Sequence, residues 1–149
     1  MSENIDKFDV LVARVFETLY SEFPKKIVLQ PTELLDCDEQ PYYNEAGYFV
    51  SPLADDESDF LYYTVSWLYE SGYLLGSING VWDSKVTLSL KGLQLLKSVP
   101  NSVESNSSLG EQLKEAIGNG AKEHAATLIK EALNMNNVMN LISGVFNQT

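Results

Sequence analysis

The chain of 149 residues has only one cysteine, Cys37, and only one histidine, His124. One cysteine cannot form an internal disulfide, which agrees with a reducing compartment. Zinc sites built from several Cys and His ligands are excluded, and a catalytic relay that depends on histidine is disfavoured. The sequence therefore predicts no catalytic residue, no cofactor and no metal site, and we expect a protein that is not an enzyme.

Long apolar runs are missing as well. No stretch approaches the roughly 18 consecutive apolar residues of a membrane-spanning helix, and the N-terminus lacks the basic and then apolar pattern of a secretory signal. We therefore expect a cytoplasmic protein that does not enter a membrane. Hydrophobic residues make up 44% of the chain and charged residues 21%, which is enough to bury a core and is unlike a disordered chain.

Positive charge is absent from one long segment. No Lys or Arg occurs in residues 27–84, which contain 11 of the 21 acidic residues, and the other 10 acidic residues match the 10 basic ones. The whole formal charge of −11 therefore belongs to residues 27–84. Such an acidic segment repels nucleic acids and attracts basic partners.

The spacing of apolar residues predicts an α+β protein that is mostly α. Apolar residues at intervals of three and four predict helices over residues 5–23, with Asn4 as N-cap, and 57–71, with Asp55 and Asp56 as capping acids. Shorter helices are expected at 31–35 and 91–97. Strands are expected at 27–29 and 48–50, and as a hairpin over 73–90 with a tight turn at Asn79-Gly80 or at Asp83-Ser84.

The region after residue 98 is predicted to be a polar linker over 99–108 and a helical extension over 109–149. Ser108 and Glu111 have the spacing of a capping box, and an apolar stripe runs from Leu113 to Leu133. We expect interruptions at Gly118 and Gly120 and again at 134–137. The stripe predicts either a homodimer through residues 109–146 or a helix that folds back on the core, with His124 as a partly buried structural residue.

Two segments carry a resemblance to a known family. Gly72-Tyr73-Leu74 ends the third predicted helix, and the run VTLSLKGLQLL at 86–96 follows. Together with the order of helices and strands, these segments make residues 5–98 similar to the winged-helix (winged helix-turn-helix) domain superfamily. The resemblance implies a winged-helix-like domain over 1–98 with a two-stranded β-wing, here interrupted by an acidic, aromatic insertion at 38–56.

The resemblance implies one of two functions. The first is a DNA-binding transcriptional regulator that uses Tyr62, Thr64, Trp82 and Lys85. Charge disfavours it, because DNA affinity comes from Lys and Arg on phosphates and the third helix has no basic residue.

We favour the second function, protein–protein contact with a basic partner through an acidic, tyrosine-rich face, in a regulatory role. The predicted contact residues are Asp36, Asp38, Glu39, Tyr42, Tyr43, Asp55, Asp56 and Asp59. Two further interpretations stay open: the tyrosines are half-buried core and the acids a solvated face, or the segment mimics DNA and inhibits a nucleic-acid-binding protein.

Overall fold

The computed structural model describes the backbone of residues 2–99 and 106–147 and the side chains of residues 2–99 and 106–134. Most of the predicted linker, residues 100–105, lies outside the described residues. The predicted class, α+β and mostly α, is confirmed. In chain order the elements are α1 (Glu3–Glu22), β1 (Ile27–Val28), α2 (Pro31–Leu34), β2 (Tyr42–Tyr43), β3 (Phe49–Val50), α3 (Asp55–Glu70), β4 (Leu74–Ser77), β5 (Lys85–Leu88), α4 (Leu90–Lys97), α5 (Leu109–Gly118) and α6 (Lys122–Asn147).

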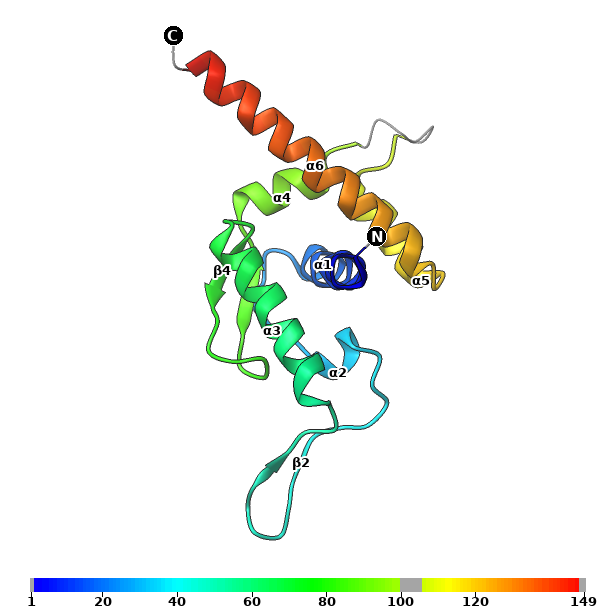
Figure 1. Cartoon of the computed structure of the whole chain (residues 1–149), viewed down its shortest axis with the longest axis vertical. Coiled ribbons are helices and arrows are strands. Elements are labelled where there is room, and N and C mark those ends of the chain that lie inside the picture. The colour runs from blue at the N-terminus through cyan, green and yellow to red at the C-terminus, as the bar shows by residue number, and fades with distance from the viewer. Residues whose placement is uncertain (1, 100–105, 148–149) are drawn as a thin grey trace.

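Helix α1 is the centre of the fold, and α3, α5, α6 and β5 all contact it (Figure 1). Val12, Val15, Phe16 and Leu19 recur at intervals of three and four, which places them on one face of the helix, and all four are fully buried. The predicted helix over 5–23 is confirmed. The predicted cap is wrong, because the helix begins at Glu3 and its N-cap position is Ser2, whose side chain makes no capping hydrogen bond.

Three strands form an antiparallel sheet in the order β1-β5-β4. Ile27 pairs with Val86 and Leu74 with Leu88, and Val86, Leu74 and Leu88 are buried against the helices. The predicted hairpin is present, but a tight two-residue turn at Asn79-Gly80 or at Asp83-Ser84 is wrong. Residues 78–84 form a longer loop, because Ser77 pairs with Lys85 and Ser84 Oγ donates a 2.7 Å hydrogen bond to the Gly80 carbonyl.

The C-terminal helices fold back on α1. The apolar stripe from Leu113 to Leu133 is buried or packs against the core, and Leu113, Leu128 and Ile129 are nearly inaccessible. The approach is close, since a Cβ added at Gly110 would lie 2.6 Å from Cε1 of Tyr20. The stripe is thus covered within the chain, and a homodimer through residues 109–146 would have to use other residues of the segment.

The predicted interruptions of this region divide into one that is confirmed and one that is wrong. Helix α5 ends at Gly118, and Gly120 has a φ of 74°, so the glycines separate α5 from α6. The asparagines at 134–137 do not interrupt α6, which continues to Asn147. Asparagine costs a helix only about 0.7 kcal/mol relative to alanine, which is less than glycine. Within the described residues, no helix is long and apolar enough to cross a membrane.

Candidate interaction site

The predicted insertion at 38–56 is a second hairpin that projects from the body of the molecule (Figure 1). Strands β2 and β3 pair antiparallel, with Tyr42 opposite Val50 and Tyr43 opposite Phe49. We call residues 42–50 the arm. The sequence predicted only one strand here, at 48–50, because each strand has just two residues and the pairing between them was not apparent.

A tight turn closes the arm. Asn44 N–H donates to the Tyr48 carbonyl, Tyr48 N–H donates to Asn44 Oδ1, both at 2.9 Å, and Gly47 has a φ of 85°. Asparagine and glycine suit such a turn, since the short amide bonds the backbone and glycine tolerates positive φ. The motif from Asn44 to Gly47 was therefore a signal in the sequence that could have revealed the hairpin.

The aromatic side chains of the arm are turned outward. Tyr42, Tyr43 and Tyr48 are 59%, 74% and 71% exposed, and Phe49 is 44% exposed. The interpretation that these three tyrosines are half-buried core residues is therefore wrong. It holds only for Tyr62, which lies on α3 and is half-buried.

One aromatic contact links the arm to the loop between β4 and β5. Phe49 lies edge-to-face between Tyr43, at 5.7 Å between ring centroids, and Trp82, at 5.3 Å. A two-stranded hairpin is barely stable alone, so this stack supports the arm. Trp82, predicted as a DNA contact, thus packs on the arm.

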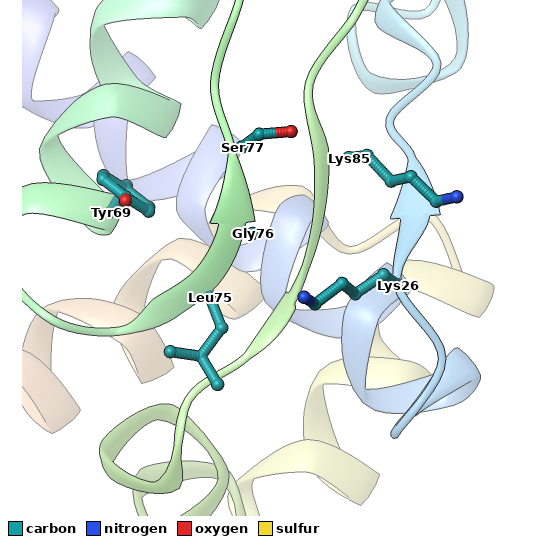
Figure 2. A pocket seen from close by; sticks show the side chains of 6 residues that line it. All are labelled: Lys26, Tyr69, Leu75, Gly76, Ser77 and Lys85. Carbon is teal, nitrogen blue, oxygen red and sulfur yellow. The ribbon is translucent and has the colours of Figure 1, made fainter.

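The other predicted DNA contacts differ in exposure: Tyr62 is half-buried, Thr64 is buried and Lys85 is exposed. Thr64 is buried at 3% exposure, and its hydroxyl donates a 2.8 Å hydrogen bond to the Phe60 carbonyl, so it cannot reach a base. Lys85 is exposed on β5 and lies beside Lys26 at a pocket on the sheet (Figure 2). The prediction that Thr64 contacts DNA is therefore wrong.

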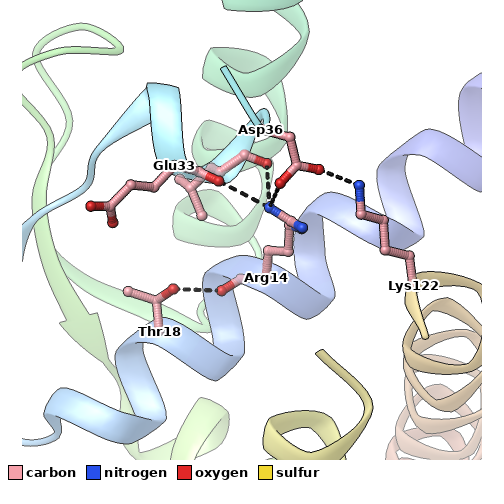
Figure 3. A network of polar contacts seen from close by, with 6 residues as sticks. Arg14, Thr18, Glu33, Asp36 and Lys122 are labelled. Atoms are coloured by element: carbon pink, nitrogen blue, oxygen red, sulfur yellow. Dashed lines mark hydrogen bonds and ion pairs between the residues drawn. The ribbon is translucent and has the colours of Figure 1, made fainter. Parts of the chain in front are cut away.

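Asp36 is exposed, and an ion-pair network holds it at the root of the arm (Figure 3). Its carboxylate forms an ion pair with Arg14 of α1 at 2.8 Å and another with Lys122, the first residue of α6. Arg14 also donates hydrogen bonds to the Glu33 and Leu34 carbonyls at the end of α2. Asp36 therefore fixes the segment that leads to the arm, and its charge is largely compensated before any partner arrives.

The charge network sets the pKa of Asp36. Partial burial alone would raise the pKa, but the hydrogen bond from Lys122 and the adjacent Arg14 guanidinium hold it below its ordinary value of 3.8. Asp36 also has a φ of 55°, a conformation that Asp and Asn tolerate better than most residues. Its sequence neighbours Asp38 and Glu39 are exposed and take no part in this network.

The acids of α3 have a structural explanation too. Asp55, Asp56 and Glu57 occupy the first turn, where negative charge interacts favourably with the helix dipole. Asp56 Oδ1 accepts a 3.0 Å hydrogen bond from the Glu57 N–H. Asp59 is exposed one turn further along. The predicted capping acids thus open the helix as its first residues, after Ala54 at the N-cap position.

His124 and Cys37 add no chemistry to this surface. His124 is exposed on α6, so the prediction of a partly buried histidine is wrong. Cys37 is half-buried, and its thiol donates a weak 3.7 Å hydrogen bond to the Glu39 carbonyl. Within the described residues, no group of three or more His, Cys, Asp or Glu side chains could hold a metal ion.

Of the eight predicted contact residues, four are exposed on the arm or at its root: Asp38, Glu39, Tyr42 and Tyr43. Asp36 forms ion pairs with Arg14 and Lys122, and Asp55, Asp56 and Asp59 lie on α3. The arm adds Tyr48, Phe49 and Glu45, which is exposed in the turn. Comparison with protein-family models, curated proteins and solved structures finds no match for the chain.

Proposed function

We propose that this protein is a non-catalytic, winged-helix-like module that binds a basic protein through the arm and the acids beside it. One observation carries the proposal: three tyrosines of a projecting hairpin are each more than half exposed. Tyrosine is favoured at the centre of protein interfaces, because its ring supplies apolar area and its hydroxyl supplies a hydrogen bond. A partner that covers these rings removes them from water.

The charge around the arm indicates what kind of partner it would bind. Asp38 and Glu39 flank the arm at its root and Glu45 lies in its turn, and all three are exposed. No basic residue occurs between Ile27 and Ser84 to compensate them. A surface of one sign accelerates encounter with a partner of the opposite sign and disfavours nucleic acid.

The winged-helix-like part of the proposal is supported by the order of the elements. Strand β1 precedes α2, the β4–β5 hairpin follows α3, and β1 joins that hairpin as the third strand. The insertion that carries the arm lies between α2 and α3, which are adjacent in a helix-turn-helix. In this proposal, the contact site lies where a winged-helix domain would have a short turn.

Affinity capture with the full chain as bait tests the proposal. The bait would be exposed to an extract of the source cells, and the bound proteins would be quantified by mass spectrometry. Two arm variants are needed, Tyr42→Ala with Tyr43→Ala, and Asp38→Lys with Glu39→Lys. We expect a basic protein that binds the wild type, is lost from both variants, and binds more weakly as salt rises.

A charge-matched control separates the arm from general acidity. Glu111 and Glu115 are exposed on α5, so Glu111→Lys with Glu115→Lys makes the same change of charge on another surface. This control should retain the partner, and Tyr63→Ala, at an exposed tyrosine of α3, should retain it as well. Equal capture by the wild type and both arm variants would refute the proposal.

A further inference from the structure

The sheet has a pocket on the face opposite to the one that buries Leu74, Val86 and Leu88, and Tyr69 of α3 also lines it. Its volume is about 640 Å³, and it is lined by Lys26, Tyr69, Leu75, Gly76, Ser77 and Lys85. It therefore brings two basic residues together in a molecule whose formal charge is −11. The arm takes no part in it.

The register of the strands explains why these side chains share one face. Leu75 pairs with Thr87 and Ser77 with Lys85, and side chains two residues apart in a strand point the same way. Leu74, Val86 and Leu88 point to the opposite face, where they are buried in the core. Figure 2 shows Lys26 reaching across β5 towards β4, while Lys85 extends in the opposite direction.

Both lysines are available to a ligand. Among the described residues, neither Lys26 nor Lys85 makes an ion pair or a side-chain hydrogen bond, in contrast to Lys122 and Lys91, which do. Asp83, two residues before Lys85, makes no ion pair with it. A lysine side chain is flexible and carries three donors, so both ammonium groups can turn towards one bound anion.

A second observation concerns Thr87, on the same face of β5. Its side chain is buried at 6% exposure, and Oγ1 has no hydrogen-bond partner within the described part of the chain. Buried polar atoms are almost always paired, so this hydroxyl lacks an acceptor, although Thr87 is not one of the residues that line the pocket. Gly76 has no room for a side chain, because a Cβ there would lie 2.1 Å from the Lys85 carbonyl oxygen, and it leaves the backbone of β4 bare.

We propose that this pocket binds a small phosphate-bearing ligand. Phosphate oxygens accept hydrogen bonds, and the two ammonium groups and the hydroxyl of Ser77 supply donors. Tyr69 and Leu75 offer an apolar wall on which the ring of a nucleotide can stack. A long duplex does not suit the site, since high-affinity DNA binding neutralises roughly 6–10 phosphates and this face has only two lining lysines.

Titration of the full chain followed by NMR tests the proposal. Sodium pyrophosphate is one probe and adenosine diphosphate the other, at constant ionic strength, with amide shifts as readout. We expect saturable shifts at Gly76, Ser77 and Lys85 with both probes. Lys26→Gln and Lys85→Gln should each weaken binding about tenfold, the effect of one hydrogen bond to a charged group. Lys97→Gln, at an exposed lysine outside the pocket, should leave it unchanged.

Further variants separate the two sources of phosphate. If the nucleotide ring stacks on Tyr69, Tyr69→Ala should weaken the binding of adenosine diphosphate and leave the binding of pyrophosphate unchanged. If inorganic phosphate is the ligand, Tyr69→Ala should change neither. Both results support a phosphate site. Lys26→Arg should retain binding, because it keeps the charge. The proposal is overturned by shifts that do not saturate below about 10 mM, by equal losses in Lys97→Gln, or by duplex DNA binding more tightly than the nucleotide.

Discussion

Helices α1, α5 and α6 bury their apolar side chains against one another, whereas the arm carries its aromatic side chains on the outside. Phe16 of α1 is fully buried, and Tyr43 of the arm is 74% exposed, although both are large aromatic residues. The helices form a core because their apolar residues recur with the helical period and meet on facing surfaces. Each strand of the arm has two residues, so it has no face wide enough to bury them. Aromatic content therefore indicates burial only where the backbone supplies a second surface.

The largest expected effect separates these two regions directly. Phe16→Ala should lower the free energy of unfolding by about 3–5 kcal/mol, because it leaves a cavity in the core. Tyr43→Ala should lower it by less than about 0.5 kcal/mol, because most of the ring is in water and its ring contact with Phe49 lies at the surface. Urea denaturation followed by circular dichroism measures both. Similar losses from the two variants would mean that the arm is part of the cooperative core.

A smaller effect is expected where the arm meets the rest of the molecule. Trp82→Ala removes the ring that packs on Phe49, a contact worth about 0.5–1.5 kcal/mol. Hydrogen exchange of the amides at 42–50 should become faster, while exchange in α1 stays the same. Tyr63→Ala, at an aromatic residue that does not contact the arm, is the control and should change neither. Unchanged exchange in the arm would show that Trp82 does not support it.

Two carboxylates, Asp36 at the root of the arm and Asp9 on α1, should affect the pH dependence of stability with opposite signs. The pKa of Asp36 is lowered, so its contribution is present above pH 3.8, the ordinary value, and is lost as the pH falls below it. Asp36→Asn should cost about 0.2–1 kcal/mol at neutral pH, typical of an exposed ion pair, and nothing in strong acid.

Asp9 of α1 supplies the opposite case. Burial raises the pKa of Asp9 above 3.8, against the attraction of Lys130, so ionisation of Asp9 costs stability as the pH rises through that raised pKa. Asp9→Asn should therefore make the protein more stable than the wild type at neutral pH and equal to it in acid. Urea denaturation at a series of pH values measures both variants. If the stabilities of the two variants relative to the wild type changed with pH in the same direction, the opposite pKa shifts of Asp36 and Asp9 would be contradicted.

The smallest expected effect is on DNA. Fluorescence polarisation with a mixed-sequence duplex at about 50 mM salt, where electrostatic binding is strongest, should show no binding to the wild type. Binding that weakens steeply with added salt and is lost in Lys85→Glu would mean that a basic patch on the sheet outweighs the acidic arm. The DNA-binding interpretation would then replace the proposed protein contact.

Particular residues show how far the sequence could predict the fold. The periodicity of Val12, Phe16 and Leu19 predicted α1, and Ser108 predicted the start of α5, where its hydroxyl accepts a hydrogen bond from the Glu111 N–H. These are local signals, set by spacing along one element. The tight turn at Asn79-Gly80 was predicted wrongly because the register of β4 on β5 depends on which residues the core buries, and turn propensity alone cannot decide it.

The candidate sites show the same division between features set by local sequence and features set by contacts between distant residues. The sequence by itself determined the fold class, the long helices and the concentration of all net charge in residues 27–84, because composition and periodicity need no knowledge of contacts. Only the tertiary structure decided which acids are paired, since Asp36 forms an ion pair with Lys122, 86 residues away, while Asp38 forms none with the residues that the structure describes. It also decided that the tyrosines of the arm face water and that Lys26 and Lys85 share a pocket. Exposure and charge pairing depend on residues that are distant in the chain, and the fold alone brings those residues together.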